Sequence, residues 1–197
     1  MAKKIKKALG MIDIENDFLD GGKLGVEGSI KKMLAFATFI LEHAKEYDLF
    51  FMSVDFHPLS HCSFKKNGGI WPVHCVQHSA GAAIFQPILD AIEEAGVELH
   101  VLTKGVDEDH EEYSVMKNAD SNKKLHSLIQ AHEIEQVDFA GIAGDYCVKD
   151  SMADFHREFP EVTIRALKPF IASIDGGKAF DEFLAKNDSI LVMDEAA

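Results

Sequence analysis

The sequence has few cysteines and prolines and no long apolar run, and each shortage excludes a class of protein. Its 197 residues include only 3 cysteines, 5 prolines and 14 glycines. Three cysteines cannot all pair within one chain, so a disulfide scaffold is disfavoured and a reducing compartment is expected. The low proline and glycine content argues against a disordered or collagen-like chain. No stretch reaches the roughly 18 apolar residues that a membrane-spanning helix needs.

Positive charge is also scarce. Twenty Lys and Arg residues face 33 Asp and Glu residues, for a formal net charge of −13. Such a chain repels phosphate backbones and anionic lipid, so we expect neither a nucleic-acid nor a membrane partner. The basic start, residues 1–7, is predicted to be a solvated lead-in, because Asp13 and Glu15 interrupt the apolar stretch before an export signal could form. We therefore expect a cytoplasmic protein.

Short apolar runs alternate along the chain with segments of helical periodicity, which predicts the fold. With 47% hydrophobic residues, a single core is expected, and no linker or repeat divides residues 1–197 into more than one domain. Strands are predicted at 8–14, 49–54, 98–103, 137–142, 162–167 and 190–193. Helices are predicted at 29–44, with Ser29 as the N-cap, and at 87–95, 121–132, 145–158 and 177–186. This order predicts a doubly wound α/β fold: a six-stranded, predominantly parallel sheet with helices on both faces.

Reactive residues stand where the predicted strands end, which is where ligands bind in folds of this class. Asp13, Asp55 and Lys104 end the first three strands, and Cys147 follows the fourth at the start of a predicted helix. Each alone has a plain structural reading as a helix cap, a surface lysine or a small buried group. Together they form a candidate acyl-transfer site. The helix start and Lys104 would favour the thiolate, Asp13 could take the thiol proton, and backbone N–H groups could hold an oxyanion.

A candidate metal site overlaps the second strand end. Asp55 and His57 alternate at the end of an extended run, so both side chains can point to one side, and His74 and His61 could complete the set. A mixed carboxylate and imidazole set suits Zn, Fe or Mn better than Ca or Mg, and three protein ligands leave positions open for water or substrate. The plain alternative is that these are ordinary members of a set of 10 histidines.

The ordered set of these motifs resembles the nicotinamidase/pyrazinamidase branch of the isochorismatase-like cysteine hydrolases over nearly the whole chain. The resemblance is carried by residues 12–18 and 21–24, by the loop segments 55–58, 61–64 and 71–75, by 104–105, and by 141–148. Gly144 departs from the pattern, because many relatives have a hydroxyl residue there.

The resemblance implies a role for each of these residues. It implies a catalytic triad of Asp13, Lys104 and Cys147, with the N–H groups of Ala143 and Cys147 as the oxyanion hole. It implies a cis peptide bond between Ile142 and Ala143, and substrate contacts from Phe18 and Trp71, which would sandwich a pyridine ring, and from Ile142. It implies one divalent transition metal ion, Zn, Fe or Mn with Zn favoured, held by Asp55, His57 and His74, while His61 is either a fourth ligand or a supporting group.

The activity implied is hydrolysis of nicotinamide, and also of pyrazinamide, through a cysteine thioester, a step of NAD salvage and pyridine nucleotide biosynthesis. Three alternatives stay open: a hydrolase of another small amide or of a vinyl ether, a non-catalytic binding protein on the same fold, and a structural zinc site. The last would use Cys62, Cys75 and His74, but these lack paired C-x-x-C spacing. The sequence leaves open whether the chain acts as a monomer or as a homo-oligomer.

Overall fold

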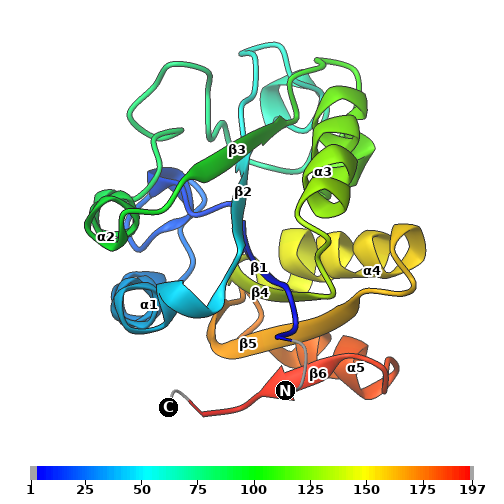
Figure 1. Ribbon diagram of the computed structural model, residues 1–197. Helices are drawn as coiled ribbons and strands as arrows, with labels where there is room; N and C mark the ends of the chain where they lie inside the picture. Colours follow the sequence, from blue (N-terminus) through cyan, green and yellow to red (C-terminus); the bar gives the residue numbers. More distant parts are fainter. Residues whose placement is uncertain (1–3, 196–197) are drawn as a thin grey trace.

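One parallel sheet organises the protein. The computed structural model describes residues 4–195, and its six strands are all parallel to their neighbours, in the order β3-β2-β1-β4-β5-β6 (Figure 1). The strands are β1 Lys7–Ile12, β2 Leu49–Asp55, β3 Leu99–Lys104, β4 Gln136–Ile142, β5 Thr163–Ala172 and β6 Leu191–Met193. From β1 the chain winds one way to β2 and β3 and then the other way from β4 to β6. The order therefore reverses between β1 and β4, where a doubly wound sheet opens a crevice.

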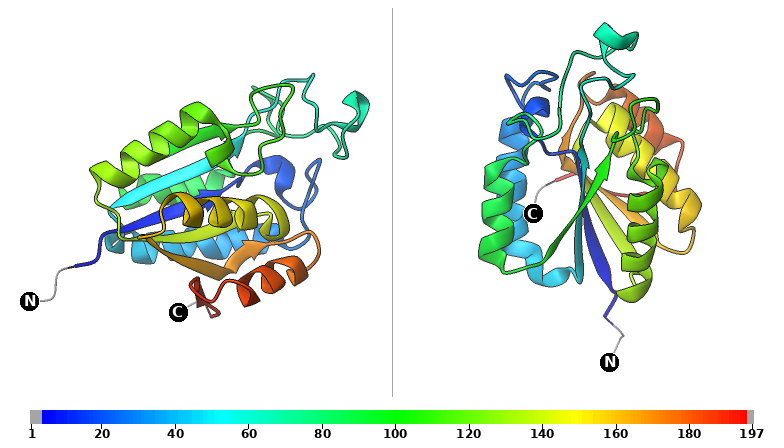
Figure 2. Two further views of the ribbon diagram at one scale, coloured as in Figure 1. Left: turned by 90° about the vertical axis from the view of Figure 1, so that its right-hand side faces the viewer. Right: turned by 90° about the horizontal axis from the view of Figure 1, so that it is seen from above.

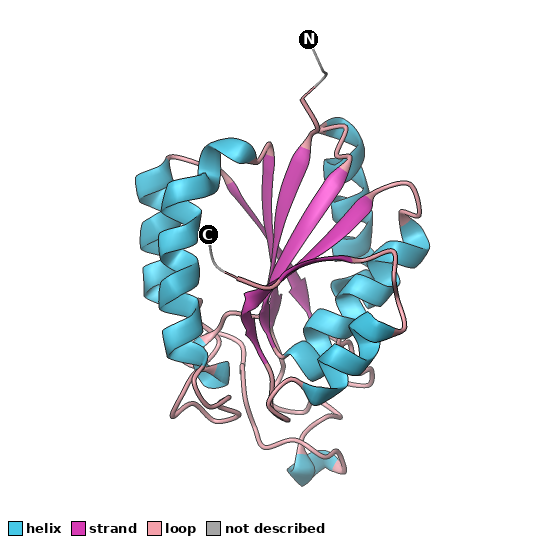
Figure 3. Ribbon diagram, turned by 90° about the horizontal axis from the view of Figure 1, so that it is seen from below, coloured by secondary structure: helices cyan, strands magenta, loops and turns pink. Residues whose placement is uncertain are grey.

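Helices cover both faces of the sheet. They are α1 Ser29–His43, α2 Gln86–Ala95, α3 Ala119–Ala131, α4 Lys149–Glu158 and α5 Lys178–Ala185. Helices α1 and α2 lie on one face, and α3, α4 and α5 lie on the other (Figures 2 and 3). Short turns of 3₁₀ helix occur at Asn16–Phe18, Ala44–Glu46, Lys65–Asn67 and Val115–Lys117, and a π-helical turn, Gly144–Val148, leads into α4.

The core forms two layers because alternate residues of the central strands point to opposite faces. On β1, Leu9 and Met11 belong to the hydrophobic cluster beneath α1 and α2. Ala8 and Ile12 belong to the cluster beneath α3, α4 and α5. A strand buried on both faces has no polar side, which is why the strands appear in the sequence as continuous apolar runs.

The predicted fold class, the six strands and the five helices are confirmed, with local differences. Ser29 is the first residue of α1 and not its cap, so that prediction is wrong. The carboxylate of Asp20 accepts the N–H groups of Gly28 at 2.7 Å and Ile30 at 2.8 Å, and so caps the helix from the preceding turn. Strand β5 runs on to Ala172, past the proline that interrupts its apolar pattern.

Three residues of the predicted basic lead-in, 1–3, lie outside the described residues, and the rest of it runs into β1. Within the described part of the chain, no helix is both long and apolar enough to span a membrane.

The amino end of the sheet is held by a buried carboxylate. Asp138 is fully buried and accepts hydrogen bonds from the Tyr47 hydroxyl at 2.7 Å, from Gln136 Nε2 at 2.7 Å and from Arg165 Nε at 3.0 Å. A second Arg165 nitrogen bonds the same carboxylate, so the guanidinium grips it with two groups. This network lies at the opposite end of β4 from Cys147.

We predict that Asp138→Asn lowers the free energy of unfolding by about 2–3 kcal/mol, because the amide cannot accept all of these bonds and leaves Arg165 without its counter-charge. Tyr47→Phe removes one donor and should cost only about 1 kcal/mol. Urea denaturation of both variants and the parent checks this. Equal and negligible losses would show that the network does not stabilise the fold.

Candidate active site and metal centre

A buried lysine joins three of the predicted strand-end residues. Lys104, at the end of β3, is fully buried. Its Nζ lies 2.8 Å from Asp13 Oδ2, 2.5 Å from Asp55 Oδ1 and 3.7 Å from Cys147 Sγ. The carboxyl ends of β1, β2 and β3 and the turn after β4 thus meet at one ammonium group, as the doubly wound topology predicts.

The charges within this group shift its pKa values strongly. Burial alone would lower the pKa of Lys104, but the carboxylates of Asp13 and Asp55 raise it well above its usual value, so the lysine is a fixed cation. Burial opposes ionisation of Asp55, yet Lys104 and His57 bring the pKa of that carboxyl well below its ordinary value. Burial raises the pKa of Asp13. It also raises the pKa of the Cys147 thiol well above its usual value, against the opposing effect of Lys104.

The last result differs from the sequence-based expectation of a favoured thiolate. The helix start and the lysine are both present, but Cys147 is buried, and loss of solvent outweighs them. The thiol therefore needs a base close by. Asp13 suits that role because burial makes its carboxylate a better proton acceptor than an exposed aspartate.

Asp13 is held in a strained but well-anchored position. It has a positive φ of 48°, which is uncommon outside glycine and typical of functional sites. Its backbone N–H donates to Ser53 O at 3.0 Å, and the Ser53 hydroxyl donates to Asp13 Oδ1 at 2.7 Å. The carboxylate is therefore oriented by a serine of β2 on one oxygen and by Lys104 on the other.

Asp55, His57 and His74 form the one group of metal-ligand donors found in the described part of the chain, with ligand atoms within 4.8 Å of one another. His57 Nδ1–H donates to Gly105 O at 2.9 Å, and His74 Nδ1–H donates to Pro72 O at 2.8 Å. Both tautomers are thereby set, and the Nε2 atoms lie 3.2 Å and 3.8 Å from Asp55 Oδ2.

This donor set fits a divalent transition metal. All three residues are buried, and two neutral imidazoles with one carboxylate are the ligands that such ions take in catalytic sites. Gly105 is required beside His57: it has a φ of +63°, and a Cβ there would lie 2.2 Å from the His57 ring.

His61 and the two loop cysteines lie outside this group. Both ring nitrogens of His61 have partners, Ser63 Oγ at 2.7 Å and His110 O at 3.0 Å, while its ring packs 4.1 Å from that of His57. Cys62 and Cys75 are free thiols and form no donor cluster with His74. The structure thus offers three ligands, with His61 packed beside one of them.

A narrow cavity opens onto these groups. The carboxyl, imidazole and thiol groups of its lining come from Asp55, Glu111, His74 and Cys147. Its other lining residues are Phe18, Leu24, Val26, Trp71, Tyr113, Ala143, Tyr146 and Ile174. The predicted contacts Phe18 and Trp71 therefore line it. Ile142 does not, because its side chain is fully buried in the core at the end of β4.

Two tyrosines complete this cavity that the sequence analysis did not single out. Trp71 Nε1–H donates to the Tyr113 hydroxyl at 3.0 Å. The Tyr146 ring meets Trp71 edge-on at 5.1 Å and lies 5.6 Å from Tyr113. The one available signal was that Tyr146 directly precedes Cys147, whereas Tyr113 lies in a loop without periodicity. These contacts fix one aromatic wall of the cavity.

Cys147 sits in the π-helical turn that leads into α4, and the Ile142–Ala143 peptide bond before it is cis, as the resemblance implied. Gly144 is explained by crowding: a Cβ there would lie 2.3 Å from Ser173 Oγ and 2.8 Å from Ile171 Cγ2. Ala143 and Cys147 both face the cavity, where the backbone of this turn can meet a substrate oxygen.

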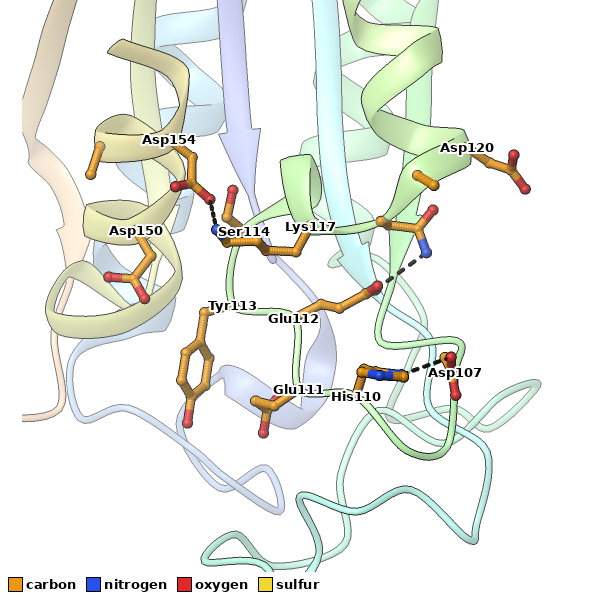
Figure 4. A pocket seen from close by; sticks show the side chains of 13 residues that line it. Asp107, His110, Glu111, Glu112, Tyr113, Ser114, Lys117, Asp120, Asp150 and Asp154 are labelled. Carbon is orange, nitrogen blue, oxygen red and sulfur yellow. Dashed lines mark hydrogen bonds and ion pairs between the residues drawn. The ribbon is translucent and has the colours of Figure 1, made fainter. Parts of the chain in front are cut away.

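A second, acidic cavity shares Glu111 and Tyr113 with the first (Figure 4). Much of its charge is paired: Lys117 Nζ lies 3.4 Å from Asp154, His110 lies 2.9 Å from Asp107, and Glu112 accepts hydrogen bonds from Asn118 and from the backbone of residue 105. The reactive group around Lys104 opens onto the first cavity and not onto this one. The other acidic residues on its walls are Glu111, Asp120 and Asp150, of which Asp150 lies 3.8 Å from Lys149 Nζ.

Comparison with known proteins agrees with this geometry. No protein-family model matches the chain. The nicotinamidase/pyrazinamidase of Mycobacterium tuberculosis is 33% identical over 152 residues, 75% of this chain and 77% of that protein. The nicotinamidase of Escherichia coli is 30% identical over 167 residues, 75% of each chain.

Solved structures show the same architecture. The pyrazinamidase of Pyrococcus horikoshii in complex with zinc superimposes with a TM-score of 0.79 at 26% identity, covering 95% of this chain and 98% of that one. PnC1 from L. infantum in complex with nicotinate gives a TM-score of 0.81 at 26% identity, covering 97% and 93%. Shared sequence over three quarters of two curated relatives, on the same fold, leads to one conclusion: the chain belongs to the nicotinamidase/pyrazinamidase family.

Proposed function

We propose that this protein hydrolyses nicotinamide to nicotinate and ammonia, and accepts pyrazinamide, through a thioester on Cys147. One observation carries the proposal: a buried Asp13–Lys104–Cys147 group meets a metal-ligand set at a cavity with aromatic walls. Phe18 and Trp71 provide flat apolar surfaces for a ring, and Cys147 lies where an attached carboxamide can be attacked. The activity of the curated relatives supports this assignment.

In the first half-reaction Asp13 takes the Cys147 proton, and the sulfur attacks the carboxamide carbon. The Lys104 ammonium, 3.7 Å from the sulfur, stabilises the thiolate as it forms. The N–H groups of Ala143 and Cys147 stabilise the tetrahedral oxyanion. The C–N bond then breaks, and the nitrogen leaves as ammonia with the proton from Asp13, so the acid and the base are one group used twice.

In the second half-reaction a water molecule attacks the thioester carbon while Asp13 takes one of its protons. The C–S bond breaks, Asp13 returns that proton to the sulfur, and the product leaves as nicotinate once its carboxyl group has lost the second water proton to solvent. The oxyanion of this step occupies the same place as the first, so the same backbone groups serve both. Asp13 can alternate in this way because Ser53 and Lys104 hold its two oxygens throughout.

We propose zinc as the ion that Asp55, His57 and His74 would hold. When bound, it supplies a Lewis acid with open positions for the ring nitrogen of the substrate. The hydrogen bonds from His57 to Gly105 and from His74 to Pro72 place the proton of each ring on Nδ1, which leaves both Nε2 lone pairs available to bind such an ion. His61 supports His57 by ring packing. The reaction belongs to NAD salvage, and the three free cysteines fit the reducing cytoplasm.

Cys147→Ala should lower kcat/KM for nicotinamide by about 10³-fold or more, because the covalent nucleophile is lost while the packing hardly changes. An ammonia-release assay measures it. Cys62→Ala is the matched control and should keep full activity, since Cys62 lies outside the cavity. Activity of Cys147→Ala within about tenfold of the parent would contradict a cysteine nucleophile.

His57→Ala should lose both bound zinc and nicotinamide affinity, because one of three ligands is removed. His126→Ala, a histidine paired with Glu158 on the surface, should change neither. Benzamide lacks the ring nitrogen, so we expect its kcat/KM to be about 10²-fold or more below that of nicotinamide on the zinc-loaded parent. Elemental analysis and kinetics before and after chelator treatment provide the measurements. Equal efficiency for the two amides, unchanged by chelation, would favour a metal-free hydrolase of small amides instead.

A further inference from the structure

Three acidic side chains alternate where β1 ends, and the mechanism uses only the first. Asp13, Glu15 and Asp17 are each at most 9% exposed. Past β1 this segment is held against the segment 81–84: Glu15 forms an isolated antiparallel bridge with Ile84, and the N–H groups of Asn16 and Asp17 donate to the carbonyls of residues 83 and 81. Two buried carboxyl groups, those of Glu15 and Asp17, thus lie beside the site without a role in the reaction.

Glu15 binds the main chain of a proposed metal ligand. Its Oε1 accepts the backbone N–H of Asp55 at 2.5 Å. Its Oε2 is buried and has no hydrogen-bond partner among the described residues, which is costly for a carboxyl group. Among the described residues, the bond to the Asp55 backbone is therefore the one hydrogen bond that offsets the burial of this carboxyl group.

Asp17 binds the main chain beside a second ligand. Its Oδ2 accepts the N–H of Cys75, the residue after His74, at 2.8 Å, and its Oδ1 accepts the N–H of Lys23 at 3.3 Å. Gly81 closes over the carboxylate, since a Cβ there would lie 2.0 Å from Asp17 Oδ2. Both oxygens are therefore fixed in an enclosed place.

The peptide unit at Cys75 connects Asp17 to both histidines. Cys75 has a φ of +42°, and its carbonyl accepts the backbone N–H of His57 at 3.0 Å. Cys75 follows His74 directly, so the Asp17 bond acts on His74 through the chain and on His57 through this carbonyl. The histidine rings are themselves oriented by backbone carbonyls, so a shift of the main chain would move the ligand nitrogens.

We propose that Glu15 and Asp17 are positioning residues of the metal site: Glu15 holds the backbone of Asp55, and Asp17 holds the Cys75 peptide that places His57 and His74. The inference rests on the proposed metal ligands and adds the two residues that hold the backbone at those ligands. Residues that hold metal ligands in place orient those ligands, and the loss of such a residue commonly lowers metal affinity by about 10–100-fold. One short segment thus carries the proposed base, Asp13, together with both supports.

Zinc affinity, measured by competition with a chromophoric chelator, tests this directly and does not depend on turnover. Glu15→Ala and Asp17→Ala should each weaken zinc binding by about 10–100-fold. Glu15→Gln should restore affinity to within about threefold of the parent, because its amide oxygen still accepts the Asp55 N–H. The zinc affinity of Asp17→Asn should lie between those of Asp17→Ala and the parent, because its side chain offers one acceptor oxygen in place of two. Asp138→Asn, also a buried carboxylate in a hydrogen-bond network, should bind zinc like the parent.

Circular dichroism establishes that each variant is folded. Should the alanine variants fail to fold, Asp17→Asn decides, and it must still weaken zinc binding. Parent-like affinity in folded Asp17→Asn and Glu15→Ala would overturn the proposal. So would a loss in Asp138→Asn as large as theirs, because the effect would then reflect general stability. A parent that binds zinc but does not release ammonia from nicotinamide would contradict the proposed function and leave this inference standing.

Excess zinc gives a second readout. If Asp17 acts through the metal site, saturating zinc should restore the kcat of Asp17→Asn to within about threefold of the parent. A kcat that stays low with the site filled would show that Asp17 acts on the reacting groups by another route, and would overturn its assignment as a metal-positioning residue.

Discussion

The site depends on one buried cation. Lys104 is fully buried, and its ammonium can be buried only because two carboxylates lie within 2.8 Å of it: Asp13, directly after β1, and Asp55, the last residue of β2. The reverse also holds, since two buried carboxylates this close would repel each other without the lysine between them. This three-charge group therefore fixes the carboxyl ends of β1, β2 and β3 relative to one another.

Lys104 also connects the two parts of the proposed site, because its ammonium contacts one carboxylate of each part, Asp13 and Asp55. In the proposed mechanism, Asp13 and Cys147 lie on the side where the carboxamide reacts, and Asp55 with the two histidines forms the side that would hold the metal. Because Lys104 contacts both carboxylates, the proposed proton uptake by Asp13 and the proposed metal binding at Asp55 would each change the charge balance around the same ammonium group. Lys104 thus holds the two carboxylates in place and, in the proposed mechanism, stabilises the Cys147 thiolate.

Much of this was predictable because parallel strands bring their ends together. Asp13, Asp55, Lys104 and Cys147 follow buried strands in the sequence, and a doubly wound topology places such residues at one edge. Helical spacing of apolar residues identified the helices. Continuous apolar runs identified the strands, because helices cover both faces of the sheet. The prediction that was wrong concerns a local hydrogen bond. Ser29 is the residue type expected to cap α1, but the Asp20 carboxylate, from the preceding turn, accepts the N–H groups at the start of the helix instead.

Other features depend on how deeply a side chain is buried and on contacts between residues far apart in the sequence. The spacing of apolar residues along the chain predicts neither. The raised pKa of Cys147 follows from its burial beneath the cavity walls, which outweighs the visible lysine and helix start. Tyr113 belongs to an aperiodic acidic loop and reaches the cavity through its contact with Trp71. The alternation of acids at 13, 15 and 17 is plain in the sequence, but their partners lie far along the chain and became known only from the fold.

Partitioning of the acyl group between water and hydroxylamine tests the central claim, a thioester on Cys147, most directly. With nicotinamide and added hydroxylamine, the parent should release ammonia equal to the sum of nicotinate and nicotinohydroxamate, with the hydroxamate share rising with hydroxylamine concentration. Cys147→Ala should form neither product beyond the uncatalysed rate. Ammonia and nicotinate formed at an unchanged rate, with no hydroxamate at any hydroxylamine concentration, would contradict the covalent mechanism and indicate direct attack of water on the amide.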